Sequence, residues 1–503
     1  MSPPNDPRGS PSFGPPVPPT PPASASLYAG YDVTRYLCAA MYTDVTLARS
    51  AVDRIIKEPR RAVASSPGVS MGCVLRHAVA ARRRQRRRDV LLSFLAVAWL
   101  VALLVAFAMG RGLGYTVAIA GFLVAWAVVA TELVSVHYGV VSHQLKRENF
   151  DPHQAPRPSN PKDAARVDTI ELRDRGNVLT SSFFPPFVGH GDTYSTWSFA
   201  LNTARAEQGK EILPFTVHEL NQHLSARVRA LGLPGLDVAE VLLVNGSDLL
   251  LGVDDRTRGE LLPHDAGPPA AHVSEVLLRG LREDGRGRAR PYLAVRVAGW
   301  GGELVSTLFL RCTVLPDRSI AFIEGSNCLL TPVRAEYRTV DTLLHSPTTR
   351  QWCRLVGEAG LRTPYLTLRA PFAVLGDLFA PISEGREQRR QERRIRLRSF
   401  NYGAEFSLRE AASSGLYYRY FQELDGELYS KTVEHRVLDA LVQFMEGHNI
   451  DTGELIQRQT TIYNSGLFAG RDISINRSSV RAGGGTSGKT ARPGRPAQSA
   501  QRR

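Results

Sequence analysis

The stretch VLLSFLAVAWLVALLVAFAMG, from Val90 to Gly110, contains 21 residues and no charged side chain. At about 1.5 Å of rise per residue, a helix of this length crosses the roughly 30 Å hydrocarbon layer of a bilayer. Helices buried in the core of a soluble protein rarely run this long without a polar stripe. The stretch therefore predicts a transmembrane helix.

A second apolar run, YTVAIAGFLVAWAVVATELVSV, begins after a turn of four residues. Its uncharged part, Thr116–Ala130, is shorter than a full span. Extending it to Val136 includes Glu132 near one end, where a carboxylate reaches the interface. A proton relay or a partner-helix contact is the alternative interpretation of this carboxylate. Because the turn is so short, we expect a helical hairpin, with spans at about 90–110 and 116–136.

The charges beside the two runs predict their orientation. The turn between them carries one arginine, whereas Lys146 and Arg147 follow the second run. Six arginines directly precede the first run: Arg82, Arg83, Arg84, Arg86, Arg87 and Arg88. By the positive-inside rule, we expect a two-helix, multi-pass protein of the plasma membrane with both termini in the cytoplasm. The same arginines predict contact with anionic lipid headgroups, in preference to nucleic acid.

Composition limits the remaining possibilities. The formal net charge is +14, but only six of the 62 basic residues are lysines, which indicates a GC-rich coding bias before it indicates a binding surface. The five cysteines are scattered and include no C-x-x-C pair, which argues against a disulfide framework and suits a reducing compartment. No apolar stretch precedes residue 90, so we expect no signal peptide.

Composition and periodicity divide the chain into segments. Ten prolines in the first 22 residues predict a disordered arm. The strands PYLAVRVA, ELVSTLFLRCTV and IAFIEG, joined by Gly- and Pro-bearing turns, predict an antiparallel meander. The predicted segments are a disordered Pro-rich arm (1–25), a helical segment ending in the arginine run (26–89), the transmembrane hairpin (90–142), a linker (143–162), an α+β domain (163–335), a helical region (336–458), a β-prone segment (459–476) and a disordered basic tail (477–503).

The fold class that follows is α+β with a transmembrane helical hairpin. A small mixed or antiparallel sheet is followed by a helical C-terminal region, and both termini are disordered. In the helical region, Val433, Val437, Leu441 and Met445 recur every fourth residue and predict a buried stripe. The arginine-rich helix Glu384–Ser399 is open to three interpretations: a solvated face, a lipid contact or nucleic-acid binding.

Two motif matches are judged spurious. GGGTSGKT, Gly483–Thr490, matches the phosphate-binding loop, but the thirteen residues after it contain two prolines and form no apolar helix face. GVSMG, Gly68–Gly72, matches the hydrolase elbow, but a proline stands where the preceding strand must end. We expect Ser70 to cap a helix instead.

Metal and cofactor sites are also not expected. In HELNQH, His218 and His223 are five residues apart and point about 140° away from each other on a helix, whereas a zinc helix spaces its histidines four apart. No other cluster of histidine, cysteine and carboxylate residues has the spacing of metal ligands along the sequence. We therefore assign no catalytic residue, no cofactor and no metal ligand.

Two loops carry what binding signal remains. FPPFVGHGDTYSTW combines rigid Pro and Gly residues with His190, Asp192 and Trp197, and a His–Asp pair can orient a general base. The segment 459–476 joins β-prone pieces with Asn-Ser-Gly and Gly-Arg-Asp, and it is interpreted either as a hairpin docked on helices or as a segment for self-association. In outline it is similar to the Asn/Gly-punctuated tails of bacterial signalling proteins that assemble by stacking.

The whole layout resembles uncharacterised two-helix integral membrane proteins of GC-rich actinobacteria, a resemblance that implies location and architecture and no activity. The functional expectation is a membrane-anchored cytoplasmic interaction, scaffold or signalling protein, not an enzyme. Its expected partners are the bilayer, anionic headgroups and a protein partner or a second copy. The alternatives are a membrane-tethered hydrolase that uses His190 and Asp192, and nucleic-acid binding at the membrane surface.

Overall fold

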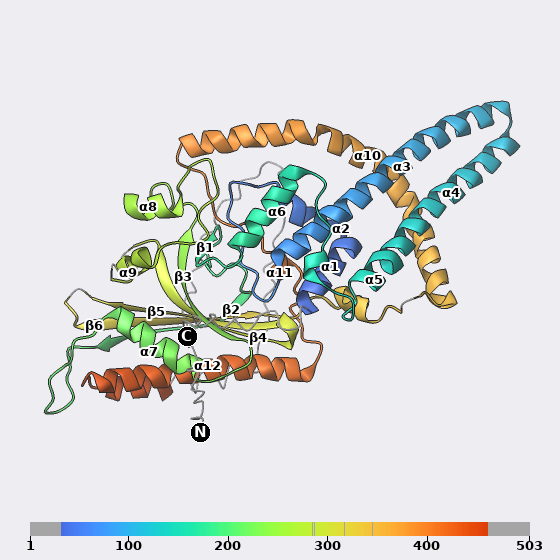
Figure 1. The fold of residues 1–503 in the computed structure, drawn as a ribbon. Coiled ribbons are helices and arrows are strands. Elements are labelled where there is room, and N and C mark those ends of the chain that lie inside the picture. The colour runs from blue at the N-terminus through green and yellow to red at the C-terminus, as the bar shows by residue number, and fades with distance from the viewer. Residues whose placement is uncertain (1–31, 284, 286, 316, 345, 461–503) are drawn as a thin grey trace, which may run out of the picture.

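The structure is a computed structural model that describes residues 32–460 except 284, 286, 316 and 345 (Figure 1). The predicted arm, the basic tail and almost all of 459–476 lie outside the described residues. The helices are α1 (Asp32–Thr43), α2 (Val45–Ala51), α3 (Met71–Met109), α4 (Arg111–Val134), α5 (Ser142–Gln144), α6 (Pro161–Arg173), α7 (Val217–Arg229), α8 (Asp255–Leu261), α9 (Glu275–Glu283), α10 (Thr349–Arg396), α11 (Leu408–Ala411) and α12 (Tyr420–Gly447). The strands are β1 (Val178–Ser181), β2 (Asp192–Asn202), β3 (Leu236–Asn245), β4 (Arg290–Gly299), β5 (Leu304–Val314) and β6 (Ile320–Leu330).

Helices α3 and α4 form an antiparallel pair that projects from the rest of the molecule, at the upper right of Figure 1. They contain the two apolar runs and meet at Gly110. The Trp99 indole of α3 donates a hydrogen bond to the Val117 carbonyl of α4, at 3.2 Å. Large apolar side chains point outward along both helices; Phe94 and Leu104 are 72% and 65% exposed. An apolar surface of this extent indicates that the protein associates with a membrane.

Three helices in the described part of the chain are long and apolar enough to cross a bilayer, where the sequence analysis predicted two. They are Met71–Met109, Leu113–Gln144 and Thr349–Arg396. The third, α10, was not predicted as a membrane span, because three prolines and several charged residues interrupt its apolar residues. Figure 1 shows that α10 crosses the α3–α4 pair instead of running beside it, and then turns back over the body.

The N-terminal half of α3 is part of a core instead of a free stalk. It packs with α1 and α2 in a hydrophobic cluster that includes Leu37, Met41 and Leu75. Asp44 caps α2, because its carboxylate accepts hydrogen bonds from the backbone N–H groups of Thr46 and Leu47. Ser70 occupies the N-cap position of α3, as expected, although its side chain makes no capping hydrogen bond.

The sheet has six strands in the order β1-β3-β4-β5-β6-β2. Only the β1–β3 pair is parallel; the β4–β5–β6 meander is antiparallel, as its sequence predicted. Strand β2 was not predicted, because the sequence analysis assigned its first six residues to a binding loop. These residues pair with β6 in the antiparallel register Trp197↔Gly325. The pairing partner lies far along the chain, so the local sequence does not reveal the strand.

Helices α7 and α12 cover one face of this sheet (Figure 1). The predicted stripe of α12 is confirmed: Val433, Val437, Leu441 and Met445 are all buried, in one cluster with residues of α7 and the meander strands. A second cluster lies where α8 and α9 pack beside β3, and it also contains Phe400 and Tyr402. The helical region therefore completes the core of the sheet.

The stretch predicted as a linker, 143–162, is packed against the body. Leu145 and Ala155 are buried in the same cluster as α1 and the first half of α3. The Ser142 hydroxyl donates to the Leu344 carbonyl at 2.8 Å. The segment after α10 is also attached, because Ala404 forms a parallel bridge with Ser181 of β1. The α3–α4 pair and the sheet are therefore joined by packing as well as by the chain.

Candidate functional site

Six arginines lie along α3 just before its apolar run, and we call them the arginine collar: Arg82, Arg83, Arg84, Arg86, Arg87 and Arg88. Arg84 donates to the Ser135 hydroxyl at 2.5 Å, and its Nε lies 3.8 Å from the Glu132 carboxylate. Arg86 Nε lies 2.9 Å from the Asp377 carboxylate of α10. The collar therefore ties all three apolar helices together at the base of the α3–α4 pair.

A cavity of about 110 Å³ lies between the collar and the neighbouring helices. Its charged lining consists of Arg84, Arg88, Glu132, Glu358 and Arg362. Pockets for small organic ligands measure about 300–1,000 Å³, so this cavity has room for water molecules or a small ion and not for such a ligand. The surface around the collar, more than its interior, is therefore the candidate site.

Helix α10 supplies that surface with a row of exposed apolar side chains, which we call the apolar stripe: Leu361, Tyr365, Leu368, Phe372, Leu375, Phe379 and Ile382. Their alternating spacing of four and three residues places them on one helix face. The opposite face packs on the α3–α4 pair, where Ala359 and Ala370 are buried with Leu92 and Ala125. The Trp126 indole also donates to the Val356 carbonyl of α10, at 2.8 Å. The stripe thus faces away from the protein.

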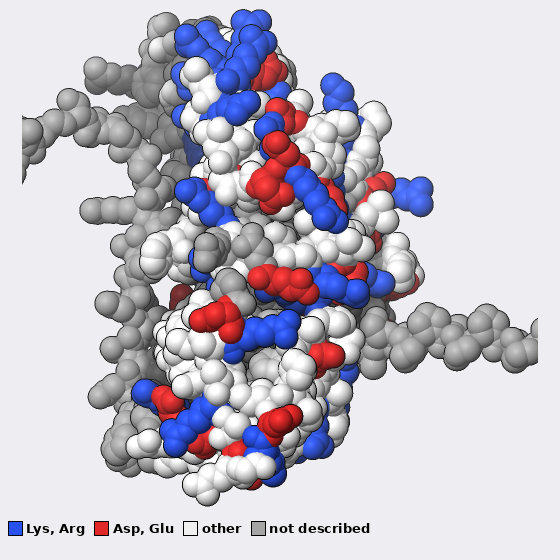
Figure 2. Space-filling view, turned by 90° about the vertical axis from the view of Figure 1, so that its left-hand side faces the viewer, with Lys and Arg blue, Asp and Glu red and all other residues white. Residues whose placement is uncertain are grey.

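The C-terminal part of α10 is strongly basic but partly neutralised. Lys57 lies 3.1 Å from Glu384, and Arg60 lies 2.9 Å from Glu392, so these acidic residues of α10 pair with the body. Figure 2 shows Lys and Arg side chains gathered at the top of one face, at the height of this part of α10 in Figure 1, whereas both signs mix lower down. The basic surface is therefore local to the α10 end of that face.

The loop before β2 does not assemble a His–Asp pair. His190 is buried, and its Nδ1 lies 3.2 Å from the Thr307 hydroxyl. Burial lowers the pKa of His190 well below its ordinary value, which favours the neutral ring. Asp192 is exposed at the start of β2. The Glu410 carboxylate accepts hydrogen bonds from the Gly189 and Gly191 N–H groups on either side of the histidine, at 2.7 and 3.0 Å.

Trp197, the third residue predicted for a ligand loop, has a packing role. Its indole N–H donates to the Glu434 carboxylate of α12, which also accepts a hydrogen bond from Asn327 at 3.2 Å. Its ring stacks on Phe199 with a centroid separation of 5.7 Å. Burial raises the pKa of Glu434. These contacts fasten α12 to the sheet, so the three predicted residues do not converge on one ligand.

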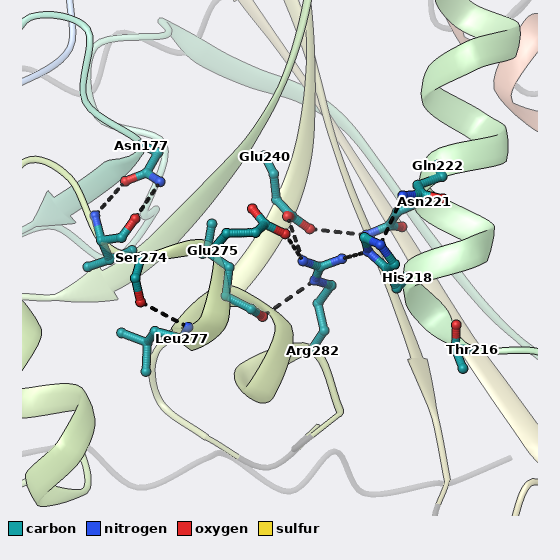
Figure 3. Close-up of polar contacts among 12 residues, drawn as sticks. Asn177, Thr216, His218, Asn221, Gln222, Glu240, Ser274, Glu275, Leu277 and Arg282 are labelled. Carbon is teal, nitrogen blue, oxygen red and sulfur yellow. Dashed lines mark hydrogen bonds and ion pairs between the residues drawn. The ribbon is translucent and has the colours of Figure 1, made fainter.

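The two histidines of HELNQH point to different neighbours, in agreement with the spacing argument. His218 contacts Arg282 of α9, whereas the His223 ring packs on Phe444 of α12. Figure 3 shows the His218 side of α7: the Arg282 guanidinium lies among His218, Glu240 and Glu275. Its Nη2 is 3.1 Å from the Glu240 carboxylate and 2.6 Å from that of Glu275. This network joins α7, α9 and β3.

Among the described residues, one cluster of metal-binding residue types is present, and it was not predicted from the sequence. Cys38 of α1 meets Cys73 and His77 of α3, and the three ligand atoms lie within 4.8 Å of one another. Hydrogen bonds to Cys38 and His77 lower the pKa of Cys73, while burial raises the pKa of Cys38. The spacing Cys73-x-x-x-His77 is the only local signal, because it places both residues on one helix face. Cys38 comes from a separate helix and joins them only in the folded chain.

Comparison with known proteins gives one match. The family model described as "AbeC: AbeC-like domain" matches residues 196–476, which is more than half of the 503-residue chain. The matched part includes α10 and strands β3 to β6 and excludes the α3–α4 pair. No curated protein and no solved structure matches the chain.

Proposed function

We propose that this chain, which belongs to the family of AbeC-like domain proteins, is a membrane-anchored scaffold whose sheet domain is held against the cytoplasmic surface of the bilayer. In this proposal, α3 and α4 span the membrane as a hairpin, and the first half of α10 lies in the interface. The observation that carries the proposal is the apolar stripe of α10, which crosses the hairpin at its base.

The stripe needs an apolar partner. Leu361 and Phe372 are 86% and 74% exposed, and contiguous apolar surface of this kind marks an interaction site. The buried face of α10 packs with Leu92, close to the end of the first apolar run that lies farthest from the Gly110 turn, and with Ala125 and Val129 in the half of the second run that lies farther from that turn. If the hairpin spans the bilayer, this level is the interface, so lipid is the nearest partner for the stripe.

The charges and prolines of α10 favour an interfacial helix over a third span. Arg369 and Asp377 lie within its apolar part, and a span through the bilayer would take both into hydrocarbon at a cost of roughly 2.5–3.5 kcal/mol each. Asp377 instead pairs with Arg86 of the collar. Pro364, Pro371 and Pro381 stand inside α10, and prolines bend helices, which suits a helix that crosses the hairpin and then turns back over the body (Figure 1). An amphipathic helix lying in the interface agrees with all three features.

The collar supports the orientation. Its six positive charges precede the apolar run of α3, and the positive-inside rule assigns such flanks to the cytoplasm. The sheet, α12 and the first half of α3 pack on the same side of the collar, so they share its compartment in this proposal. Each basic side chain near an anionic leaflet adds about 1 kcal/mol of attraction. The partner that the proposal names is therefore an anionic bilayer.

Depth measurements on α10 test the proposal. Single spin labels are attached after Leu361→Cys, Leu368→Cys or Phe372→Cys, each combined with Cys353→Ser, since Cys353 is the exposed native cysteine. In vesicles containing anionic lipid, we expect collisions with oxygen to exceed those with a water-soluble nickel complex at all three positions. An in-plane helix also predicts nearly equal depths at Leu361 and Phe372.

The depth measurement has a control on a helix outside the stripe. Leu172→Cys on α6 is 85% exposed but lies outside the stripe, so its label should meet the nickel complex and not the lipid. A spanning α10 would separate the depths of Leu361 and Phe372 by about 16 Å, since eleven residues rise about 1.5 Å each. Either that separation, or full access of the nickel complex to the stripe, would overturn the interfacial placement.

A further inference from the structure

The buried cluster of Cys38, Cys73 and His77 has the geometry of a metal site. The three residues are 0%, 1% and 3% exposed, inside the core formed by α1, α2 and the first half of α3. The Cys38 and Cys73 sulfur atoms are 3.7 Å apart. A disulfide has an S–S bond of about 2.05 Å, so the two thiols approach each other without the spacing of a bond.

The observed spacing agrees with tetrahedral coordination. Zinc–sulfur bonds are about 2.3 Å long, and two such bonds at the tetrahedral angle place their sulfur atoms about 3.8 Å apart. The Cys38–Cys73 separation is within about 0.1 Å of this value. The His77 ligand atom lies within 4.8 Å of both sulfur atoms, so a small movement of the ring completes a three-ligand set. The donors are therefore nearly in place before any ion binds.

Helices α1 and α3 each contribute two residues, four apart, to the site. Cys73 and His77 are four residues apart on α3, and Cys38 and Tyr42 are four residues apart on α1, so each pair lies on one helix face. Cys38 faces Cys73, and the Tyr42 hydroxyl lies 3.1 Å from His77 Nδ1. Tyr42 therefore orients the imidazole ring, in the way that outer hydrogen-bond partners orient the histidine ligands of metals.

The charge of the site selects the ion. A pair of thiolates in an apolar core requires compensation, because burying an isolated charge is strongly unfavourable. Two thiolates and one divalent cation sum to zero, and a neutral imidazole leaves that sum unchanged. Thiolate and imidazole donors suit zinc, whereas carboxylate and carbonyl donors suit magnesium or calcium.

We propose that Cys38, Cys73 and His77 hold a zinc ion that fastens α1 to the first half of α3. The site lies beneath the cavity at the arginine collar, since Tyr42 lines that cavity and contacts His77. The ion would join the N-terminal helix of the described chain to the helix that enters the membrane. Because the donors are buried, the ion enters while the protein folds.

Elemental analysis of the full-length protein tests the proposal. The protein is purified in detergent without chelator and without a histidine tag, and its zinc is measured by plasma mass spectrometry. We expect about one zinc ion per chain, and a roughly tenfold or greater loss in Cys73→Ser and in His77→Ala. Cys312→Ser is the matched control, because Cys312 is buried in the sheet away from the cluster and its replacement should leave the zinc content unchanged.

A second measurement does not depend on the variants folding. Wild-type protein expressed with cobalt in place of zinc should show sulfur-to-cobalt charge-transfer absorption, which reports thiolate ligation directly. Absence of both stoichiometric zinc and this absorption would overturn the proposal. A disulfide between Cys38 and Cys73, found by mass spectrometry of the unreduced protein, would overturn it as well, because its sulfur atoms are no longer thiolate ligands.

Discussion

Single buried charged residues fasten the loops beside the sheet. Arg409 is fully buried, and its guanidinium donates to the backbone carbonyls of Glu303 and Thr331 at 2.8 and 2.9 Å. Burial lowers the pKa of Arg409 to about 10, so it stays charged at neutral pH. The next residue, Glu410, binds the His190 loop instead. Two consecutive side chains thus connect α11 to one end of the sheet, where β2 and β5 begin and β6 ends. Each supplies hydrogen bonds that the buried backbone needs.

The Glu410 carboxylate gives a prediction at this scale. Glu410→Ala leaves the Gly189 and Gly191 N–H groups without their acceptor, and we expect it to lower the free energy of unfolding by about 2–3 kcal/mol. Glu410→Gln keeps an acceptor oxygen and should cost less. Thermal unfolding of the detergent-solubilised protein measures both. Equal stability of wild type and Glu410→Ala would contradict the role assigned to this carboxylate.

The same residue predicts a pH dependence. Burial raises the pKa of Glu410 above its ordinary value of 4.5, so the folded protein disfavours the ionised form. The stability contributed by this group therefore rises as the pH falls through the raised folded-state pKa toward 4.5. Wild type should gain stability relative to Glu410→Gln across that range, because the glutamine does not titrate. A constant difference between the two would contradict the shift.

Helix elements depend on close approaches that only small residues allow. At Gly121 of α4, an added Cβ atom would lie 2.1 Å from Trp99 Cδ1 of α3. The Trp99 ring is held by its hydrogen bond to the Val117 carbonyl, so it does not move away without losing that bond. On α10, by contrast, a Cβ atom at Gly376 meets nothing within 4 Å. The two glycines therefore differ in packing while both lie inside helices.

Their substitution is expected to have opposite effects. Gly121→Ala should destabilise the α3–α4 pair by about 1–3 kcal/mol through overpacking. Gly376→Ala should be neutral or stabilise α10 by up to about 1 kcal/mol, because alanine has the higher helix propensity. Melting temperatures in one detergent compare the two variants. A loss of stability at Gly376 that matches the loss at Gly121 would contradict the role assigned to the Trp99 contact.

At the scale of the whole molecule, α3 connects the body to the exposed apolar part of the α3–α4 pair. Its 39 residues extend about 58 Å, with the first part in the core and the last part exposing apolar side chains. Helix α10 contacts α3 at Arg86 and at Leu92, and the stretch 143–162 packs on the body. The sheet is therefore attached to the α3–α4 pair by packing as well as by the chain.

The orientation of this unit is testable in cells. Ser487→Cys introduces a thiol after the described residues, and Cys353→Ser removes the exposed native thiol while the four buried cysteines remain. If the proposed orientation holds, a membrane-impermeant maleimide labels the new cysteine only after lysis, because the positive-inside rule predicts a cytoplasmic location for the side of the membrane that carries the collar. The Cys353→Ser parent is the control for background labelling. Labelling in intact cells would place the sheet outside the cytoplasm.

The sequence by itself determined the features that depend on local pattern: the two apolar runs, the buried stripe of α12, the meander β4–β5–β6 and the divergent directions of His218 and His223. Each follows from the spacing of apolar or functional residues along a helix or a strand, which the local sequence specifies. Only the tertiary structure decided the features that combine distant segments. Strand β2 forms because β6 pairs with it. The apolar stripe is exposed because the other face of α10 packs on α3 and α4. Cys38 reaches Cys73 and His77 because α1 packs across α3. Contacts between such segments arise from packing of the folded chain, which no local period records.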